Sequence, residues 1–564
     1  MEENQQMKTG AELLLDSLVA EGTDYIFGYP GGAVLPLYDA LYSYEGIQHI
    51  LTRHEQGATH AAEGYAKVTG KPGVVLVTSG PGATNAITGI ADAMSDSIPL
   101  IVITGQVATP GIGKDAFQEA DITGITMPIT KYNYQVRDVA DLPRIVKEAF
   151  HLATTGRKGP VVIDLPKDMT IAQATPKVLP PVSLPSYQPT IQPNQLQVRK
   201  VLAALKEAKK PVVLAGAGVI HAYATAELQA FVERYQLPTL TTLLGLGALP
   251  HEHPLFLGMG GMHGSFAANM ALTDCDLLLN FGSRFDDRLA SAPNEFAPNA
   301  TVVHVDIDPA EIGKVIPTHI PIVADAKATL AALLESKEAI DVRTDWVRLN
   351  ETRKARHPFK FDREQTVEIK PQQVIETIGQ LTRGEAIVVT DVGQHQMWAA
   401  QFYPFHYDHQ FVTSGGLGTM GYGIPAAIGA KIGQPDKEVI LFVGDGGFQM
   451  TNQELAILNH YQVPIKVVLL NNQSLGMVRQ WQESFFGERR SESVFEEQPD
   501  FVKLAEAYRI KAVKLSDPTT LQADLAAAFA YEGPELIEVM ISPTEHVLPM
   551  VPAGKANHQM LGVE

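Results

Sequence analysis

Two neighbouring stretches decide the fold: V-I-L-F-V-G-D-G-G-F at residues 439–448 and I-K-V-V-L-L-N-N at residues 465–472. Each is an apolar run that ends in polar residues, and the chain between them has room for one helix, predicted over about 452–460. Nearly uninterrupted apolar strands that alternate with helices are typical of parallel sheets covered on both faces. The pair therefore predicts a strand–helix–strand unit with Asp445 and Asn472 at the carboxyl ends of successive strands, where such sheets bind ligands.

The same alternation extends over the rest of the chain. Further apolar runs lie at residues 74–77, 100–103, 161–165, 211–215 and 386–390. A proline-rich stretch at 175–193 and a charged stretch at 336–370 interrupt the pattern as linkers. We therefore predict an α/β protein of three doubly wound, parallel-sheet domains, over residues 1–175, 190–340 and 370–564. Thr-Ser-Gly turns at 78–80 and 413–415 each open a stretch of small residues, which suggests that the two outer domains are related.

Composition excludes several classes of function. With 564 residues the chain is too long for a single core, and its 45% apolar and 19% charged residues fit an ordinary soluble enzyme. The formal net charge of −19 argues against a nucleic-acid or anionic-membrane partner. Cys275 is the one cysteine, which excludes an intramolecular disulfide and a multi-cysteine zinc site. No apolar leader or membrane-spanning run stands out, and we expect a cytoplasmic protein.

The polar residues after the two strands indicate a ligand. Asp445 and Asn472 offer hard oxygen ligands that suit Mg²⁺ or Ca²⁺. Gly444, Gly446 and Gly447 let main-chain N–H groups approach an anion where a helix starts. A cation beside an anion cradle indicates a metal-bridged diphosphate. A glycine turn and an asparagine turn without any ligand are the simpler alternative, but their pairing across one strand–helix–strand unit favours the diphosphate.

G-D-G followed by N-N at this spacing resembles the signature of thiamine diphosphate enzymes. Further motifs are Y-P-G-G-A (29–33), R-H-E-Q-G-A (53–58), S-G-P-G-A-T-N (79–85), D-A-F-Q-E (115–119), G-S-R-F-D-D-R (282–288) and G-M-V-R-Q-W-Q (476–482). Together they resemble the large catalytic subunit of acetohydroxyacid (acetolactate) synthase, of the biosynthetic, FAD-containing type. The resemblance covers essentially the whole chain, and several long motifs in the right order make it specific.

The resemblance implies thiamine diphosphate and Mg²⁺ as cofactors. Asp445, Asn472 and the carbonyl group of Ser474 would hold the metal. Met420 would support the thiazolium ring from below, although both it and Met477 could equally be core residues. The residues implied for thiamine diphosphate are Pro30, Glu55, Gly393, Gln394, His395, Gly418, Met420, Gly446, Gly447 and Met477.

Glu55 has three interpretations. R-H-E-Q-G-A-T-H at 53–60 nearly spells the His-Glu-x-x-His zinc helix, but Ala58 stands where the second histidine is needed. A carboxylate at a helix start is a purely structural role, because the positive end of the helix dipole stabilises it. The resemblance implies a third role, in which Glu55 exchanges a proton with the pyrimidine ring of the cofactor and activates it. Such a carboxyl should be buried, and the small residues that follow fit.

The resemblance also implies the reaction. The family decarboxylates pyruvate on thiamine diphosphate and transfers the hydroxyethyl unit to pyruvate, giving 2-acetolactate, or to 2-ketobutyrate, giving 2-aceto-2-hydroxybutyrate, at the first common step of valine, leucine and isoleucine biosynthesis. Arg288 would hold the carboxylate of the acceptor, and Trp481 would favour 2-ketobutyrate by about 1 kcal/mol. Without the resemblance, Arg288 would be interpreted as part of a surface ion pair, and Trp481 as an aromatic residue of the core. Further pocket residues would be Gly32, Phe117, Gln118 and Lys167.

A second cofactor is indicated in the middle of the chain. V-L-A-G-A-G-V-I-H at 213–221 is an incomplete dinucleotide fingerprint, because His221 replaces the last glycine, and alone it is a weak signal. The resemblance implies an FAD site, with a structural role because the reaction is redox-neutral. Its residues would be Arg157, Gly216, Gly218, Met262, His263, Gly282, Arg284, Asp286, Arg288, Asp306, Asp308 and Asp325.

Three alternatives stay open. A pyruvate oxidase uses the same two cofactors, a catabolic acetolactate synthase lacks FAD and the Trp481 motif, and a third reading is a non-catalytic paralogue. The resemblance further implies that cofactor-binding surfaces from different subunits meet, so that a homodimer is the smallest active unit. It leaves open a tetramer and a small regulatory subunit.

Overall fold

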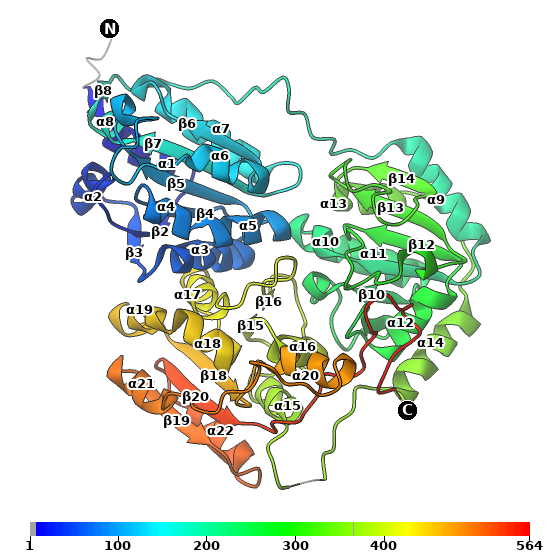
Figure 1. Ribbon diagram of the computed structural model, residues 1–564. Helices are drawn as coiled ribbons and strands as arrows, with labels where there is room; N and C mark the ends of the chain where they lie inside the picture. Colours follow the sequence, from blue (N-terminus) through cyan, green and yellow to red (C-terminus); the bar gives the residue numbers. More distant parts are fainter. Residues whose placement is uncertain (1–6, 365, 564) are drawn as a thin grey trace.

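The computed structural model describes residues 7–364 and 366–563, and it contains three six-stranded sheets that are parallel throughout. Helices lie on both faces of each sheet, as Figure 1 shows. The predicted α/β class with three parallel-sheet domains is confirmed. Among the described residues, none of the helices combines the length and the hydrophobicity needed to span a bilayer.

The N-terminal sheet has the strand order β3-β2-β4-β5-β7-β6. Its strands are β2 (Tyr25–Tyr29), β3 (Gln48–Leu51), β4 (Gly73–Val77), β5 (Leu100–Gln106), β6 (Tyr132–Gln135) and β7 (Pro160–Pro166). The helices are α1 (Gly10–Ala20), α2 (Leu35–Tyr42), α3 (Glu55–Thr69), α4 (Pro81–Asn85), α5 (Ile87–Asp96), α6 (Ile122–Thr126), α7 (Leu142–Thr154) and α8 (Lys167–Ile171). β1 (Lys8–Thr9) and β8 (Gln173–Ala174) form a separate antiparallel pair.

The central sheet has the order β11-β10-β9-β12-β13-β14. Its strands are β9 (Pro211–Ala215), β10 (Thr239–Thr241), β11 (Phe256–Met259), β12 (Leu277–Phe281), β13 (Thr301–Asp306) and β14 (Ile320–Val323). The helices are α9 (Gln195–Glu207), α10 (Ala217–His221), α11 (Thr225–Tyr235), α12 (Phe266–Asp274), α13 (Ala326–Leu334) and α14 (Thr344–Arg356). Counted along the chain this is the order 3-2-1-4-5-6 of dinucleotide-binding sheets, in which the direction of winding reverses between β9 and β12.

The C-terminal sheet has the order β16-β15-β17-β18-β20-β19. Its strands are β15 (Ile387–Thr390), β16 (Phe411–Val412), β17 (Val439–Gly444), β18 (Ile465–Asn471), β19 (Lys511–Leu515) and β20 (Glu535–Met540). The helices are α15 (Pro371–Leu381), α16 (Gln394–Phe402), α17 (Gly423–Gly433), α18 (Asp445–Thr451), α19 (Leu455–His460), α20 (Gly476–Phe485), α21 (Phe501–Ala507) and α22 (Leu521–Phe529). The helix predicted over 452–460 is present as a 3₁₀ turn at Asn452–Glu454 followed by α19, and α18, which begins at Asp445, is a further helix before it.

The two outer sheets have the same order, 2-1-3-4-6-5 when each is counted along the chain. This agreement supports the idea that the outer domains are related. The Thr-Ser-Gly similarity that suggested it was misplaced, however. The turn at 78–80 follows β4, the third strand of its sheet, whereas the turn at 413–415 follows β16, the second of its own. By position, the counterpart of the R-H-E-Q-G stretch is the loop after β16, and the counterpart of S-G-P-G is G-D-G-G.

Equivalent helices of the outer domains pack against each other: α3, which follows β3, crosses α17, which follows β16. The backbones touch through glycine. A Cβ atom added to Gly64 would lie 2.0 Å from the carbonyl oxygen of Ala426, and one added to Gly429 would lie 1.7 Å from that of Ala61. No side chain larger than hydrogen fits at either crossing point, so the glycines set the distance between the two domains.

The segment after β20 leaves the C-terminal sheet and packs on the central domain (Figure 1). The amide of Val551 donates to the carbonyl oxygen of Met262 (2.8 Å), and the side-chain amide of Asn557 donates to Asn269 Oδ1 (3.2 Å) and to the carbonyl oxygen of Leu289 (3.0 Å). The chain thus returns to a domain whose sheet ended more than two hundred residues earlier. One buried apolar core is shared by the central and C-terminal domains, and another by the N-terminal and C-terminal domains.

Candidate active site

The predicted metal ligands meet at the carboxyl edge of the C-terminal sheet. Asp445 follows β17, and Asn472 and Ser474 follow β18, which pairs with β17 along its whole length. The amide of Ser474 donates to Asp445 Oδ2 (3.1 Å) and to Asn472 Oδ1 (3.2 Å), so both oxygens converge on one point. All three residues are buried, and burial raises the pKa of Asp445 to about 6. A buried carboxylate beside amide and carbonyl oxygens is a donor set that fits a hard cation.

The residues predicted for the diphosphate surround this point. Gln394 Oε1 accepts a hydrogen bond from Asn472 Nδ2 (3.1 Å), and His395 lies so close to Gly444 that an added Cβ would be 2.9 Å from His395 Nδ1. Burial lowers the pKa of His395 to about 3, and its Nε2 has no hydrogen-bond partner among the described residues. A neutral imidazole nitrogen and main-chain N–H groups at the start of α18 are donors that suit a phosphate.

Methionines line the same edge. The terminal methyl group of Met420 lies 3.5 Å from the Cβ position of Gly446, so Met420 extends over the G-D-G-G turn. Gly447 is held close to Asp391, where an added Cβ would be 2.3 Å from a carboxylate oxygen. Gly418 adopts a positive φ of 71° in the loop that leads to Met420. Met420 therefore lies beside the turn predicted to hold the diphosphate.

An open apolar cavity of about 640 Å³ lies against α20, the helix that follows Ser474 in the chain. Met477 and Trp481 line it on one face of that helix, with Phe486 beyond its end. The guanidinium group of Arg288, from the central domain, lies 5.9 Å from the centre of the Trp481 ring. The two predicted acceptor residues are therefore neighbours, although almost two hundred residues separate them in the sequence. The guanidinium group of Arg288 also makes a loose ion pair with Asp287 (3.7 Å) and contacts Met262 Sδ (3.7 Å), and the side chain stays exposed, which leaves it accessible to a carboxylate.

The predicted N-terminal residues gather around the S-G-P-G turn after β4. Glu55 begins α3, is 9% exposed, and accepts a hydrogen bond from Asn85 Nδ2 (3.0 Å). A Cβ on Gly82 of the turn would lie 3.2 Å from Glu55 Oε1, and one on Gly80 would lie 2.7 Å from the carbonyl oxygen of Gln118. Glu55 and Gln118 therefore lie on opposite sides of the S-G-P-G turn, with little more than the main chain of the turn between them. The zinc-helix interpretation has no further support, because His54 instead caps α3 by accepting from the amide of Gln56.

The other predicted N-terminal residues lie at the surface. Phe117 is 88% exposed, Gly32 has no atom within 4 Å of its Cβ position, and Pro30 is exposed at the end of β2. Lys167 is half-buried at the start of α8. Within the described parts of this single chain, no hydrogen bond or ion pair joins these residues, or Glu55, to the predicted metal ligands. The chain presents the N-terminal and C-terminal groups as separate sets.

Sequence reasoning missed Glu454, an acidic neighbour of Glu55. It comes from the C-terminal domain, and its carboxylate accepts two hydrogen bonds from the amide of Arg53 (3.0 and 3.2 Å). Burial raises the pKa of Glu454 to about 7. The carboxylate of Glu454 reaches the main chain of Arg53 because the two outer domains pack together, although the two residues are about four hundred positions apart in the sequence. The one local sign was an acid soon after the G-D-G-G helix, in T-N-Q-E-L at 451–455.

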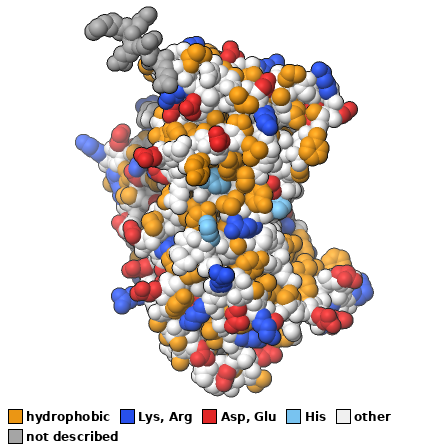
Figure 2. Space-filling view, turned by 90° about the vertical axis from the view of Figure 1, so that its left-hand side faces the viewer, with side chains coloured by type: hydrophobic (Ala, Val, Ile, Leu, Met, Phe, Trp, Pro, Cys, Tyr) orange, Lys and Arg blue, Asp and Glu red, His pale blue; other side chains and the backbone are white. Residues whose placement is uncertain are grey.

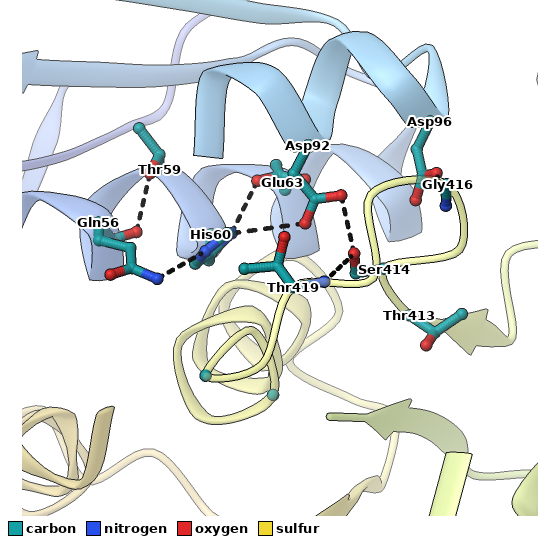
Figure 3. A network of polar contacts seen from close by, with 12 residues as sticks. Gln56, Thr59, His60, Glu63, Asp92, Asp96, Thr413, Ser414, Gly416 and Thr419 are labelled. Atoms are coloured by element: carbon teal, nitrogen blue, oxygen red, sulfur yellow. Dashed lines mark hydrogen bonds and ion pairs between the residues drawn. The ribbon is translucent and has the colours of Figure 1, made fainter. Parts of the chain in front are cut away.

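A buried polar network on α3 and α5 was also missed (Figure 3). His60 Nδ1 lies 2.9 Å from Glu63 Oε1 and 3.9 Å from Asp92 Oδ2, and all three side chains are inaccessible to solvent. Burial lowers the pKa of His60 to about 4 and raises those of Glu63 and Asp92, the latter to about 8. The carboxyl pair therefore holds a proton at neutral pH. The network continues through Asp92 and Asp96 into the loop that precedes Met420.

A second cavity, of about 390 Å³, lies where the winding of the central sheet reverses, and the N-terminal domain closes one side of it. Six residues predicted for FAD line it: Arg157, Gly218, Gly282, Arg284, Asp306 and Asp325. The β9 and β12 ends pack backbone to backbone, since a Cβ on Gly216 would lie 2.3 Å from the carbonyl oxygen of Gly282. Arg157 pairs with Asp308 (3.2 Å) and Glu311 (2.8 Å). The volume of the cavity and its position fit a small-molecule site at a topological switch point.

The remaining predicted FAD residues do not line this cavity. Met262, His263 and Arg288 lie where the central domain meets the C-terminal segment, and His263 Nδ1 is 3.4 Å from the carbonyl oxygen of Pro549. Asp286 Oδ1 accepts from the amides of Arg288 (2.9 Å) and Leu289 (3.2 Å), so it stabilises its own turn. The predicted set thus divides into a cavity group and a group beside Trp481.

Comparison with known proteins places this geometry in a family. Three thiamine pyrophosphate enzyme models match the chain: the N-terminal TPP binding domain at residues 8–125, the central domain at 198–333 and the C-terminal TPP binding domain at 391–539. The chain is 59% identical to the acetolactate synthase large subunit of Lactococcus lactis, with 98% of this chain and 96% of the relative covered. It is 47% identical to the isozyme 3 large subunit of Escherichia coli (98% of both covered) and 49% identical to the large subunit of Corynebacterium glutamicum (97% and 89%). The chain therefore belongs to the acetolactate synthase large-subunit family of thiamine pyrophosphate enzymes.

Proposed function

We propose that the chain is the catalytic subunit of an acetolactate synthase that condenses pyruvate with a second 2-keto acid. The products are 2-acetolactate from pyruvate and 2-aceto-2-hydroxybutyrate from 2-ketobutyrate, in the synthesis of branched-chain amino acids. The observation that carries this proposal is the approach of Arg288 to Trp481 beside the metal-ligand edge. A fixed cation and a flat apolar surface are what recognition of a short 2-keto acid requires, one for its carboxylate and one for its alkyl chain.

Asp445, Asn472 and Ser474 would hold Mg²⁺, and the start of α18 with His395 would hold the diphosphate. The convergence of their oxygens on one point and the unpartnered His395 nitrogen support this assignment. When bound, thiamine pyrophosphate would supply a carbon nucleophile and an electron sink, the chemistry that decarboxylation of a 2-keto acid requires.

The protein side chains control protons and substrate position. Glu55 would hold and exchange one proton at its carboxyl group, with Asn85 fixing one oxygen. Its burial excludes bulk water from that exchange. Arg288 would bind the acceptor carboxylate, and the ring of Trp481 would pack against the alkyl group, where 2-ketobutyrate offers one more methyl group than pyruvate. Gln118, across the S-G-P-G turn from Glu55, would contact the substrate from the N-terminal side.

A homodimer would complete this site. Glu55 and the predicted metal ligands form separate sets in one chain, so a second chain must bring the complementary set to each. Large apolar side chains are exposed in both outer domains, among them Phe117 (88%) in the N-terminal domain and Met450 (55%) and Leu417 (48%) in the C-terminal domain. Figure 2 shows hydrophobic side chains over one face of the molecule, many of them in its upper half, where the N-terminal domain lies. The relatives are named large subunits, which fits a small regulatory partner as well.

FAD would bind in the 390 Å³ cavity as a structural cofactor. Arg157, Lys158 and Arg284 line the cavity and offer positive charge for a diphosphate, and Asp306 and Asp325 offer acceptors for ribose hydroxyl groups. Burial raises the pKa of Asp306 to about 6.

We further propose that the domains end near the predicted limits of 1–175, 190–340 and 370–564. We also propose that the enzyme works in the cytoplasm, where the single buried Cys275 stays reduced.

A product assay tests the proposal. The purified chain is given pyruvate, 2-ketobutyrate, Mg²⁺ and thiamine pyrophosphate, with and without FAD, and both acetohydroxy acids are measured by mass spectrometry while an electrode follows oxygen. We expect both products and no oxygen uptake. Oxygen consumption or flavin reduction in step with pyruvate use would indicate an oxidase instead. Parental activity after complete removal of FAD, with unchanged thermal stability, would refute its structural role.

A further inference from the structure

The loop at 413–423 carries Met420, and a buried aspartate holds each of its ends. At the far end Asp391, from the same domain, accepts hydrogen bonds from the amides of Gly421 (3.0 and 3.1 Å) and Gly423 (2.8 Å). At the near end the aspartate comes from the N-terminal domain. Asp96 Oδ2 accepts from the amide of Gly415 (3.0 Å), and Asp96 Oδ1 accepts from the amide of Gly416 (2.7 Å).

A second acid on the same helix holds the neck of the loop. Asp92, one turn before Asp96 on α5, accepts from the hydroxyl of Ser414 (2.9 Å). The same hydroxyl oxygen accepts from the amide of Thr419 (2.9 Å), which precedes Met420. Figure 3 shows this path from α5 through Ser414 to Thr419. One side chain of the N-terminal domain is thus two hydrogen bonds away from the residue beside Met420.

Both carboxylate oxygens of Asp96 take part in contacts with this loop or with Lys67. The side chain of Asp96 is inaccessible to solvent, and Lys67 Nζ of α3 pairs with Asp96 Oδ2 at 2.8 Å and also donates to the carbonyl oxygen of Thr413. The approach is so close that a Cβ on Gly416 would lie 2.9 Å from Asp96 Oδ1. Buried hydrogen bonds to an ionised carboxylate are stronger than neutral ones, and leaving their donors unpaired is costly.

We propose that Asp96 and Asp92 are positioning residues, through which the N-terminal domain fixes the Met420 loop of its own chain. The inference rests on the proposed function in taking Met420 as a support for the cofactor. Lys67 adds a mechanical link, because α3 carries Glu55 at its first residue and Lys67 in its last turn. A displacement of α3 therefore moves the proton-exchanging carboxyl and the loop anchor together. Asp96 also lines the 390 Å³ cavity proposed for FAD, but neither aspartate contacts the residues predicted to hold the diphosphate and Mg²⁺, so toward that site both act through the loop.

The test combines hydrogen exchange with cofactor binding in the full-length protein. Asp96→Asn removes the charge and one of the two acceptors for successive amides. We expect the amides of residues 414–419 to exchange about tenfold faster, because a hydrogen bond to a charged group contributes on the order of 1.5–3 kcal/mol. We expect the Kd for thiamine pyrophosphate with Mg²⁺, measured by calorimetry, to rise about tenfold, with kcat lower and KM for pyruvate unchanged.

Two further variants keep the test decisive. Asp121→Asn is the matched control, since Asp121 in the same domain also accepts from a main-chain amide, that of Gly124 (2.9 Å), away from the loop. It should leave exchange at 414–419 and the Kd at their parental values. Ser414→Ala cuts only the path from Asp92 to Thr419 and should give a smaller change of the same kind, even where Asp96→Asn folds poorly.

The outcomes separate this inference from the proposed function. Hydrogen exchange measures the loop without cofactor, so a parent that binds no thiamine pyrophosphate would refute the function and leave the loop contact standing on the exchange data. Unchanged exchange in both Asp96→Asn and Ser414→Ala would overturn the inference. Faster exchange with a parental Kd and kcat would also overturn it, because the contact would then stabilise the fold without positioning Met420.

Discussion

Replacing Gly429 by alanine tests whether backbone contact sets the distance between the outer domains. The added Cβ would lie 1.7 Å from the carbonyl oxygen of Ala61 and 2.7 Å from its carbonyl carbon. Carbon and oxygen atoms pack at about 3.5 Å, so α3 and α17 would have to separate by roughly 1.8 Å. Both clashing atoms belong to the main chain of a helix, and no flexible side chain can move aside.

The expected cost follows from this separation. Overpacking of a well-filled core costs about 1–3 kcal/mol, and a rigid main-chain clash belongs at the upper end. Alanine favours a helix over glycine by about 1 kcal/mol, which opposes the loss. The net loss of about 2 kcal/mol corresponds to a fall in Tm of roughly 4–8 °C for domains of this size. Scanning calorimetry of the full chain without cofactor measures it directly.

Gly111→Ala is the control for the loss of glycine itself. Its Cβ would meet nothing closer than 3.4 Å, and Gly111 does not have a positive φ. We expect a Tm within about 1 °C of the parent, in keeping with a surface substitution that disturbs no contact. Gly64→Ala combined with Gly429→Ala should cost less than the sum of the two, since one separation relieves both clashes. A Gly429→Ala protein as stable as its parent would refute the packing argument.

Three other substitutions have expected outcomes. Glu55→Gln should lower kcat by about 10²–10⁴ and leave the Kd for thiamine pyrophosphate within a few-fold, because it removes an exchangeable proton but little volume; unchanged turnover would contradict the role of the carboxyl group. Trp481→Leu should reduce the preference for 2-ketobutyrate over pyruvate about fivefold, a change of about 1 kcal/mol in a competition assay; equal product ratios would count against it. Burial lowers the pKa of His221 to about 3, below its unfolded value, so this histidine destabilises the fold as pH drops below about 6.5. Between pH 7.5 and 5.5 we expect His221→Gln to lose about 1.4 kcal/mol less stability than the parent in denaturant titrations; identical losses would show that His221 is protonated in the folded chain.

The strands were predictable because each sheet is buried on both faces, which leaves apolar runs such as V-I-L-F-V unbroken in the sequence. The positions of Asp445 and Asn472 followed from the same rule, since parallel neighbours end at one edge. The start of α18 was not predictable: G-D-G-G reads as a turn, yet the helix begins at Asp445. Glycine disfavours a helix interior, and here close packing against Asp391 overrides that preference.

Contacts between domains left no local pattern. Asp92 and Asp96 read as ordinary polar residues of a helix, but the loop after β16 buries both. Glu454 likewise owes its role to the amide of Arg53, four hundred residues earlier. The position of Arg288 beside Trp481 followed only from the resemblance to a family, because no periodicity links two residues on different domains. Sequence patterns report which face of an element is buried, and they carry no information on which distant surface buries it.

The return of the C-terminal segment to the central domain has a consequence for biosynthesis. Domains fold in order as the chain emerges from the ribosome. The central sheet is complete once β14 has been made. The carbonyl oxygens of Met262 and Leu289, however, can accept their hydrogen bonds from Val551 and Asn557 only after these later residues have been made. These late contacts surround the loop that carries Arg288. A nascent chain can therefore build its sheets early, while the proposed acceptor site around Arg288 stays unfinished until Val551 and Asn557 have been made and have reached the central domain.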